Sequence, residues 1–489
     1  MNRAVVRRTA AALARWLDEH DVDGPVVIGR DARHGSAEFA SDSAAVIAAT
    51  GREVIVSPEP EPTPLLAFAV RHLGAAAGVM VTASHNPAAD NGYKVYAGNG
   101  AQIVPPDDSE IAAHIDAVGA VVDLPLAPPD DPAITEWGDD VREAYLTQVA
   151  ALRRTDDRVE ARVAYTPMHG VGADLLLAAF DRSSLRRPAL VEAQARPDPD
   201  FPTAPFPNPE EPGALDQLLD LARREQSTLA IANDPDADRL AVAIPTATGW
   251  RVLTGDEIGI LLADHLLRHT TGDDRLVATT VVSSSMLAAL AAAHGVHHAE
   301  TLTGFKWLAA ASMARPDLRF VLGYEEALGY STGEVVRDKD GISAAVVFTE
   351  LVAALEASGS SVEQRLDDLA AEHGVHLTAQ WTRRFEGVDG VDRMASSVER
   401  LRSEPPAVLG DVTIDTVEDL RLGERLPPTD AVVLRGRGLR VIVRPSGTEP
   451  KLKAYVEVVS PPDDDLARAR DAAARRLQDA LDAVSSLLD

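Results

Sequence analysis

Residues 79–96 read VMVTASHNPAADNGYKVY, an apolar run that stops at Thr82 and opens into a polar turn. The turn places the hydroxyl of Ser84 and the imidazole of His85 directly after a segment typical of a buried strand. A cation, Lys94, follows ten residues after the serine. Taken alone, this stretch fits an ordinary surface loop as well as a functional site, so its meaning depends on the rest of the chain.

The pattern of strand, loop and helix seen around this turn recurs along the chain. One round runs from PVVIG (25–29) to the turn itself, and the next from RVAYTP (162–167) to IANDPDADRLAV (231–242). A third round runs from GDEIGILLADHLL (255–267) to LGYEEALGY (322–330). Short β-branched strands that alternate with helices predict parallel α/β sheets.

After about residue 375 the pattern changes to long alternating strands and a closing helix, which indicates an antiparallel α+β domain. The predicted fold class is therefore α/β, with three similar domains of mixed, mainly parallel sheets and a C-terminal α+β domain. The predicted domains are 1–135, 136–248, 249–372 and 373–489. Candidate linkers are 123–132, the Gly249-Trp250 turn and 371–380. The Pro-rich stretch 196–215 is expected to be an ordered, exposed connection inside the second domain.

Length and composition restrict the possible functions. A chain of 489 residues is too long for one hydrophobic core, and its net charge of −29 argues against nucleic-acid binding. No apolar run reaches the length of a membrane helix, and the N-terminus has the spacing of an amphipathic helix rather than a targeting peptide. We therefore expect a cytoplasmic protein. The absence of cysteine excludes disulfides, thiolate metal sites and cysteine nucleophiles.

Lysine is rare in this chain, because arginine supplies nearly all of the 47 basic residues. An ammonium group is a compact charge whose pKa responds to its surroundings, so the retained lysines are candidates for function, although chance retention on the surface is the alternative. All of them lie in polar, turn-rich segments: Lys94, Lys306, Lys339, Lys451 and Lys453.

The segment IANDPDADRLAV carries Asp234, Asp236 and Asp238 at alternate positions. In extended backbone this spacing turns the three carboxylates to one side, where a divalent cation such as Mg²⁺ would relieve their repulsion. An EF-hand begins with the same spacing, but it requires Gly and Glu where this chain has Arg239 and Pro245. A solvated acidic turn is the other interpretation.

Three more segments carry polar groups at strand ends or helix starts. VIVRPSGTEPKLKAYVEV (441–458) combines a guanidinium, hydroxyls and a glycine, which are the components of a phosphate site, although a plain β-turn is possible. LGYEEALGY offers Glu325 and Glu326 as acceptors for sugar hydroxyls. TLTGFKW (301–307) places Lys306 at a helix start, where a cation opposes the helix dipole. No Gly-Lys pair occurs in the chain, which excludes a P-loop NTPase.

The segments TASHNP, DPDADR, GYEEALGY and RPSGTEPK, in this order and spacing, resemble the α-D-phosphohexomutase superfamily of phosphoglucomutases and phosphomannomutases. The likeness covers the whole chain, and DNGYKVY, TLTGFKW and EEALGY look most like the phosphoglucomutase-2 and phosphopentomutase branch. The resemblance implies four domains around a central cleft, with one loop contributed by each. It also implies Mg²⁺ and a sugar 1,6-bisphosphate as activator and intermediate.

The resemblance also implies residue roles. Ser84 matches the phosphoserine, whose oxygen would complete a metal site formed by Asp234, Asp236 and Asp238. The residues implied around the reacting phosphate are Ser84, His85, Lys94, Arg239 and Lys306, with Lys94 as a candidate general acid or base. The residues implied for substrate binding are Glu325, Glu326, Arg444, Ser446, Gly447, Thr448 and Lys453.

Two departures from the family pattern affect these expectations. Ala327 stands where relatives often have serine, which removes a possible sugar contact. Relatives begin with a Gly-Thr-x-Gly-x-Arg-Gly loop that this sequence does not contain, so we expect the first domain to be N-terminally incomplete.

The predicted activity is interconversion of glucose 1-phosphate and glucose 6-phosphate by a monomer or weak homodimer that binds a small phosphosugar and neither nucleic acid nor membrane. Alternatives within the class are phosphomannomutase, phosphopentomutase and glucose-1,6-bisphosphate synthase. Alternatives outside the class are a Mg²⁺ phosphatase and a catalytically weak sugar-phosphate-binding protein.

Overall fold

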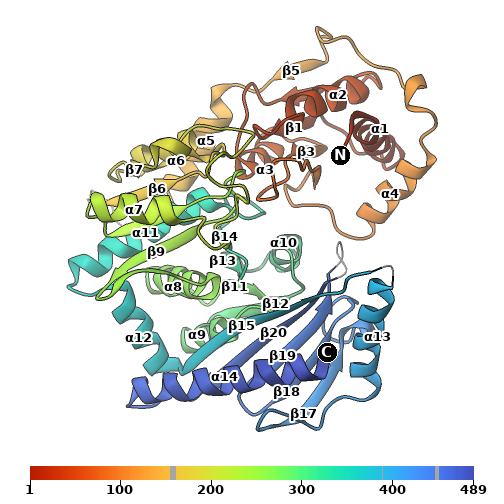
Figure 1. The fold of residues 1–489 in the computed structure, drawn as a ribbon. Helices are drawn as coiled ribbons and strands as arrows, with labels where there is room; N and C mark the ends of the chain where they lie inside the picture. The colour runs from red at the N-terminus through yellow and green to blue at the C-terminus, as the bar shows by residue number, and fades with distance from the viewer. Residues whose placement is uncertain (155–160, 388, 447–450, 489) are drawn as a thin grey trace. The chain divides into compact units, whose positions relative to one another are not determined.

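The computed structural model describes residues 1–154, 161–387, 389–446 and 451–488 (Figure 1). The chain forms two compact units. Unit 1 comprises Met1–Leu276 and Gly304–Ser361, and unit 2 comprises Val277–Thr303 and Val362–Asp489. The division falls inside β11 (Arg275–Thr280), so the third of the repeated α/β segments contributes to both units.

The first sheet of unit 1 has five strands in the order β4-β3-β1-β2-β5. The central β1 (Val26–Arg30) pairs in parallel with β2 (Val54–Val56) and β3 (Ala77–Val81), and β5 (Ile134–Glu136) extends the sheet in parallel beyond β2. At the other edge β4 (Lys94–Ala97) runs antiparallel to β3. The central β1 and its neighbour β3 consist almost wholly of buried apolar residues because helices cover the sheet, whereas the edge strand β5 is partly exposed.

The helices of this domain begin at α1 (Arg3–Glu19), where the side chain of Asn2 caps the helix by accepting a hydrogen bond from the Val5 amide. The amphipathic helix predicted at the N-terminus is therefore confirmed. α1, α2 (Ser36–Ala48) and α4 (Asp107–Ala117) share one apolar cluster with the strands, and α3 (Thr63–His72) packs against β1 and β3. The short helix η1 (Val121–Asp123) precedes β5.

The second sheet has the order β10-β9-β8-β6-β7. The central β6 (Val163–Thr166) pairs in parallel with β7 (Ala189–Leu190) and β8 (Leu229–Ala232). The strands β9 (Ala241–Thr246) and β10 (Gly249–Val252) complete it as an antiparallel hairpin. The other elements of this segment are α5 (Asp139–Ala150), α6 (Gly172–Arg182), η2 (Glu192–Gln194) and α7 (Asp216–Arg224).

The two sheets share a topology that positions the candidate site. In each sheet the third strand of the round ends in a turn, and the chain then returns as an antiparallel strand: β3 to β4, and β8 to β9. The antiparallel pair β13 (Arg319–Glu325) and β14 (Gly329–Thr332) repeats this step. The predicted α/β repeats are confirmed, and each of them closes with an antiparallel strand. The remaining helices of unit 1 are α8 (Gly255–Arg268), α10 (Phe305–Met313) and α11 (Gly341–Ala357).

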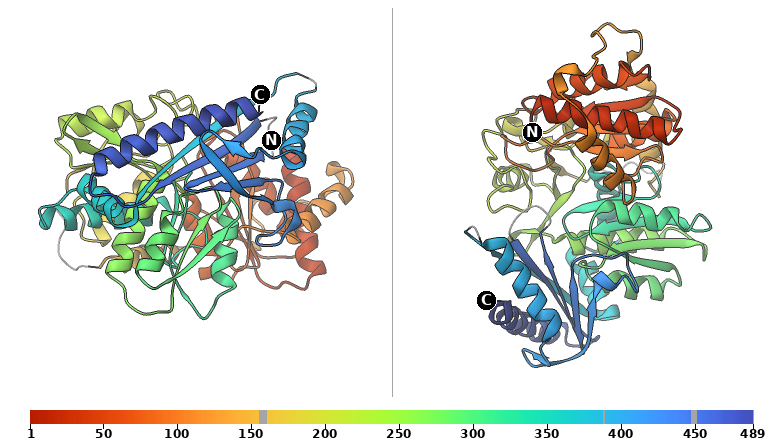
Figure 2. Two further views of the ribbon diagram at one scale, coloured as in Figure 1. Left: turned by 90° about the horizontal axis from the view of Figure 1, so that it is seen from below. Right: turned by 90° about the vertical axis from the view of Figure 1, so that its right-hand side faces the viewer.

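In unit 2, a six-stranded antiparallel sheet has the order β15-β20-β19-β18-β17-β16, as expected for the C-terminal α+β domain. The helices α13 (Gly390–Ser403) and α14 (Leu466–Leu488) share one apolar cluster with this sheet, and α14 runs along it (Figure 2). The strands are β15 (Val375–Arg384), β16 (Val408–Leu409), β17 (Val412–Asp419), β18 (Val432–Gly436), β19 (Leu439–Pro445) and β20 (Lys451–Ser460). Unit 2 also contains α9 (Met286–Ala293), β12 (His297–Thr301), α12 (Val362–His373) and η3 (Leu420–Leu422).

Two predicted linkers are wrong. The Gly249-Trp250 turn belongs to the β9–β10 hairpin, because Gly249 pairs with Thr246 inside the second sheet. The segment 371–380 contains the end of α12 and most of β15, whose alternating polar residues belong to a strand that pairs along its whole length with β20. The predicted domain boundaries stay a prediction.

Among the described residues, no single helix is long and apolar enough to cross a membrane. The bent pair α11 and α12 passes the same test of length and composition when taken together, and most of α11 is buried inside the protein.

Candidate active site

The turn between β3 and β4 presents Ser84 at the end of a buried strand. Ser84 has a left-handed backbone with φ 50°. Its amide donates a hydrogen bond to the Thr82 hydroxyl oxygen over 3.0 Å. Gly92 lies against the turn so closely that a Cβ there would come within 2.3 Å of the Thr82 carbonyl oxygen. The half-buried Ser84 hydroxyl donates to Asp234 Oδ2 over 2.8 Å and lies 3.2 Å from His85 Nδ1.

The turn between β8 and β9 carries the three aspartates, and all of them are fully buried. One carboxylate oxygen from each lies within 4.8 Å of the others. The predicted convergence of Asp234, Asp236 and Asp238 therefore matches the geometry. Ala237 is left-handed with φ 56°, and Gly170 lets Pro235 approach to a distance that a Cβ would block.

Two lysines compensate this acidic group. Lys94 Nζ donates to Asp236 Oδ2 over 2.8 Å and to Asp238 Oδ2 over 2.9 Å. Lys339 Nζ lies 3.3 Å from Asp238 Oδ2. Burial lowers the pKa of Lys94, but Asp236 and Asp238 outweigh it and raise the pKa well above its usual value. Lys94 is therefore held as a cation between two carboxylates.

The pKa values of Asp234 and Asp236 are shifted in opposite directions. Burial, together with the neighbouring Asp236 and Asp238 carboxylates, raises the pKa of Asp234. Burial acts in the same direction on Asp236, but Lys94 overcomes it and holds the pKa of Asp236 below its usual value. Thr63 contributes by donating its hydroxyl hydrogen to Asp236 Oδ2 over 2.7 Å.

The donor set fits a hard divalent cation. Among the described residues, Asp236 Oδ1 and Asp238 Oδ1 are buried without a hydrogen-bond partner, and such oxygens are costly unless a cation or water binds them. Three carboxylates within 4.8 Å also repel one another in a buried site. The triad thus has both free ligand atoms and excess negative charge.

The third turn, between β13 and β14, places Glu325 in the same environment. Its side chain is buried, and burial raises its pKa while Lys339 and Arg239 act in the opposite direction. Leu328 is left-handed with φ 62°, so each of the three turns contains a non-glycine residue in this conformation. The backbone of Arg239, after the aspartate turn, forms an antiparallel β-bridge with Gly329, after the Glu325 turn. The Arg239 guanidinium lies 3.3 Å from Glu210.

His85 and Lys306 differ in their relation to this group. Burial, followed by the Arg239 charge, lowers the pKa of His85 to about 3, so the imidazole beside Ser84 is neutral. Lys306 lies in the first turn of α10, and its ammonium is 3.6 Å from Asp108 on α4 and 5.8 Å from the Trp307 ring centroid. No interaction in the described part of unit 1 joins Lys306 directly to Ser84 or the aspartates. Glu326 is half-buried beside Glu325.

The described residues of the predicted phosphate loop lie in unit 2, at the end of β19 and the start of β20. Arg444 pairs with Lys453 across the strands, and the Ser446 amide donates to the Lys451 carbonyl over 2.7 Å. The hairpin therefore places two predicted cations side by side on its ladder. Gly447 and Thr448 lie outside the described residues.

Sequence reasoning missed several residues of the unit 1 site. Lys339 was noticed only as a rare lysine, and Thr63 and Arg33 were not singled out. Each contacts a segment far away in sequence: Thr63 and Asp236 are separated by 173 residues. The rarity of lysine was the one available signal for Lys339.

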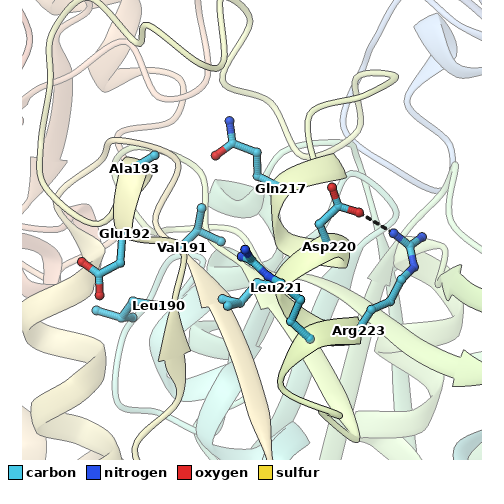
Figure 3. Close-up of a pocket in the computed structure, with 9 residues that line it drawn as sticks. Leu190, Val191, Glu192, Ala193, Gln217, Asp220, Leu221 and Arg223 are labelled. Carbon is cyan, nitrogen blue, oxygen red and sulfur yellow. Dashed lines mark hydrogen bonds and ion pairs between the residues drawn. The ribbon is translucent and has the colours of Figure 1, made fainter.

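A separate cavity of about 710 Å³ lies elsewhere in unit 1, between the edge strand β7 and helix α7 (Figure 3). Asp220 pairs with Arg223 over 2.6 Å, and Glu192 and Arg224 also line the cavity, so its acidic and basic side chains balance. None of the predicted site residues lines it, and we do not assign the reaction to it.

Comparisons with known proteins agree with the three turns. Family models match residues 1–121, 143–249 and 254–373 as "Phosphoglucomutase/phosphomannomutase, alpha/beta/alpha" domains I, II and III. The C-terminal domain model of the same family matches residues 413–476. The matched regions contain the Ser84, aspartate and Glu325 turns and the Arg444 hairpin.

Individual proteins resemble the chain over nearly its whole length. A "Probable phosphomannomutase" of Haemophilus influenzae is 40% identical over 465 residues, which cover 94% of this chain and 93% of that protein. A "Probable phosphoribomutase" of Schizosaccharomyces pombe is 38% identical, with 88% of this chain and 78% of that protein covered. The crystal structure of a "putative phosphomannomutase" from Thermus thermophilus is 27% identical, with a TM-score of 0.73 and coverage of 98% and 95%.

Proposed function

Since the chain belongs to the phosphoglucomutase/phosphomannomutase family, whose members are isomerases that move phosphate within a sugar, we propose that it interconverts glucose 1-phosphate and glucose 6-phosphate. The proposed path passes through phosphorylated Ser84 and a glucose 1,6-bisphosphate intermediate. The observation that carries the proposal is the 2.8 Å hydrogen bond from the Ser84 hydroxyl to Asp234 of the buried triad. It joins the proposed phosphate carrier to the proposed metal ligands.

The two half-reactions balance without net gain or loss of phosphate. A sugar hydroxyl oxygen attacks the phosphorus on Ser84, the bond from phosphorus to Ser84 Oγ breaks, and the hydroxyl proton is transferred to Oγ. The sugar then carries two phosphates. After it turns over, Oγ attacks the other phosphorus, the bond to the sugar oxygen breaks, and the proton returns to that oxygen. Such transfers are catalysed mainly by positioning and charge neutralisation.

The residues of the three turns supply those two effects. Asp234, Asp236 and Asp238 would hold Mg²⁺ together with an oxygen of phosphorylated Ser84. When bound there, the ion would neutralise charge on the transferring phosphoryl group. Lys94 and Lys339 lie against the same carboxylates as cations, and the neutral His85 lies beside Oγ.

Substrate recognition is proposed for the other candidate residues. Glu325 and Glu326 accept hydrogen bonds from sugar hydroxyls, and Arg239 and Lys306 provide positive charge for phosphate. Arg444, Ser446 and Lys453 bind the phosphate that does not react, since a guanidinium and an ammonium on one hairpin are suited to phosphate oxygens. Gly447 and Thr448 belong to the same proposed loop.

The sugar is tested by comparing substrates directly. The chain is incubated with Mg²⁺, glucose 1,6-bisphosphate and either glucose 1-phosphate, mannose 1-phosphate or ribose 1-phosphate, and products are followed by ³¹P NMR. We expect glucose to give the highest kcat/KM. Because relatives are named for mannose and ribose, a higher value for either sugar would reassign the substrate. Release of inorganic phosphate without isomerisation would contradict the mutase proposal.

A further inference from the structure

Arg33 is a buried arginine beside the Ser84 turn, and in the described part of the chain it hydrogen-bonds to the Ser84 backbone rather than to the Ser84 side chain. It follows β1 in the loop RDARHGS (30–36), and it is 4% exposed. Burying a guanidinium is costly unless its hydrogens find acceptors, so the contacts of this residue indicate its purpose. In the described structure, the hydrogen bonds of its guanidinium all go to backbone carbonyls of one segment.

That segment is the Ser84 turn. Arg33 Nη2 donates to the carbonyl oxygens of Ser84 over 2.6 Å and of Asn86 over 2.7 Å. Nη1 donates to the carbonyl oxygens of Pro87 over 2.8 Å and of Asp90 over 3.4 Å. Four carbonyls of an irregular turn thus converge on one planar group, which fixes the path of the backbone on both sides of His85.

The guanidinium is itself held from two directions. Its Nε lies 3.2 Å from Asp31 Oδ2, and Asp31 is fixed in turn by the Ser36 hydroxyl at 2.6 Å. The ring of Phe201 covers it, with the centroid 4.9 Å from the guanidinium carbon. Phe201 is 2% exposed and comes from the Pro-rich connection 196–215, which was expected to be exposed.

We propose that Arg33 is a positioning residue, which holds the Ser84 turn in its left-handed geometry through backbone carbonyls, and that Phe201 holds Arg33. This inference rests on the proposed role of Ser84. It explains why an irregular connection in the second domain is ordered around one buried aromatic ring. It also explains how Ser84 keeps its side chain available while its backbone is constrained.

The test is Arg33→Lys, because a single ammonium cannot span four carbonyls as a planar fork does. Misplacing a reacting group by about 1 Å can cost about 100-fold in rate. We therefore expect kcat, and the rate of Ser84 phosphorylation by glucose 1,6-bisphosphate, to fall about 10- to 100-fold. The KM for glucose 1-phosphate should stay within about threefold, since the substrate is held elsewhere.

Arg275→Lys is the matched control. Arg275 is also buried, and its guanidinium also donates to backbone carbonyls, those of Leu267, Thr270 and Gly272. It should lose thermal stability as Arg33→Lys does, while kcat stays within about twofold. Equal kcat in the two variants at equal folded fraction would overturn the proposal.

Hydrogen exchange separates this inference from the proposed function. If Arg33 holds the turn, amides in 82–92 exchange faster in Arg33→Lys than in the Arg275→Lys control, whether or not Ser84 is ever phosphorylated. Unchanged exchange overturns the inference, and absence of phosphoserine in the unaltered protein overturns the proposed function alone. If Arg33→Lys does not fold, Phe201→Leu is the deciding variant. A smaller loss of kcat together with faster exchange supports the proposal. If kcat and exchange both stay unchanged, the proposal is refuted.

Discussion

The Ser84 turn and the aspartate turn occupy the same place in two sheets of one topology, yet they are held in opposite ways. In the Ser84 turn the backbone carbonyls are bound by Arg33 and the half-buried side chain makes few contacts. In the aspartate turn the side chains themselves are fully buried and paired with Lys94, Lys339 and Thr63. One turn is fixed so that its side chain can react, and the other so that its side chains stay in place.

Both turns contain a non-glycine residue in a left-handed backbone, and so does the Glu325 turn. This conformation costs roughly 1–2 kcal/mol for a residue with a Cβ, so it persists only where surrounding contacts compensate for it. Glycines supply close contacts around the turns: Gly92, Gly170 and Gly255 each lie against a turn where a Cβ would collide with backbone. The repeated use of strain at one topological position supports a shared function for the three turns.

The largest effect is expected for Ser84→Ala, which removes the proposed phosphate carrier. Loss of a covalent nucleophile typically costs at least about a thousandfold in kcat. The fold should survive, because the half-buried hydroxyl contributes only its hydrogen bonds to Asp234 and His85. Measurements of kcat, intact mass and Tm check this, with the exposed Ser109→Ala as control. Isomerase activity retained by Ser84→Ala would contradict the division between the two turns.

The next effect is expected for Asp236→Asn in the aspartate turn. The change removes one buried charge from the proposed metal site and weakens the contact that Lys94 makes with Oδ2 at 2.8 Å. We expect at least about tenfold weaker Mg²⁺ binding and about 100-fold lower kcat, with little change in KM. Isothermal titration with Mg²⁺ and steady-state kinetics measure both quantities, with the exposed Asp220→Asn as control. Unchanged Mg²⁺ affinity would show that the metal is held elsewhere.

The difference between the two turns also explains how much the sequence could predict. Ser84 and the triad follow apolar strands as short polar turns, and this local pattern can be read without a structure. Mixed sheets were predicted, but the antiparallel strands that follow each turn were not located, because a strand as short as the four residues of β4 carries little pattern. Arg33 was missed because its function depends on carbonyl oxygens, which every residue has and no residue type reveals.

Errors in the sequence interpretation share a physical origin. Within 371–380, residues 375–380 are polar at alternate positions, which suits a strand with one covered face, but the segment was interpreted as a linker. Lys339 lies 101 residues from its carboxylate partner Asp238, so only the folded chain shows that they meet. Contacts within a turn are visible in sequence, whereas contacts that join turns depend on tertiary packing.

The Arg444 hairpin belongs to neither turn, and Arg444→Ala tests whether substrate binding is separate from transfer. Losing one charge-assisted contact costs about 1.5–3 kcal/mol, which corresponds to about 10- to 100-fold in KM. We expect kcat to change by less than about threefold, the reverse of the pattern for Asp236→Asn. Arg437→Ala, in the turn between β18 and β19, is the control. A loss confined to kcat would assign Arg444 to the transfer step instead.

The smallest effect concerns the segment that supports the aspartate turn from outside. Thr63 donates its amide hydrogen to the Asp236 carbonyl over 3.0 Å, and two residues earlier the Glu61 amide donates to the Arg30 carbonyl over 2.9 Å. The Glu61 side chain is 12% exposed, and its nearest cation, Arg142, is 3.7 Å away. Burial raises the pKa of Glu61 to about 7, with Asp174 and Glu59 adding to the shift and Arg142 opposing it. Burial therefore outweighs the ion pair that this carboxyl group makes with Arg142.

Glu61→Gln should consequently stabilise the protein in a pH-dependent way. Because the pKa of Glu61 is about 7 in the folded state and 4.5 ordinarily, the folded state binds the proton more tightly. The stability that this proton contributes is fully present below pH 4.5. This stability is lost as the pH rises through about 7. The wild type therefore becomes less stable than the variant, whose glutamine is neutral at every pH. We expect the variant to gain about 1–3 kcal/mol between pH 4.5 and pH 8. Melting temperatures of both proteins at these two pH values measure the gain, with exposed Glu211→Gln as control. A gain that is larger at pH 4.5 would reverse the sign and show that Arg142 pairs with an ionised Glu61.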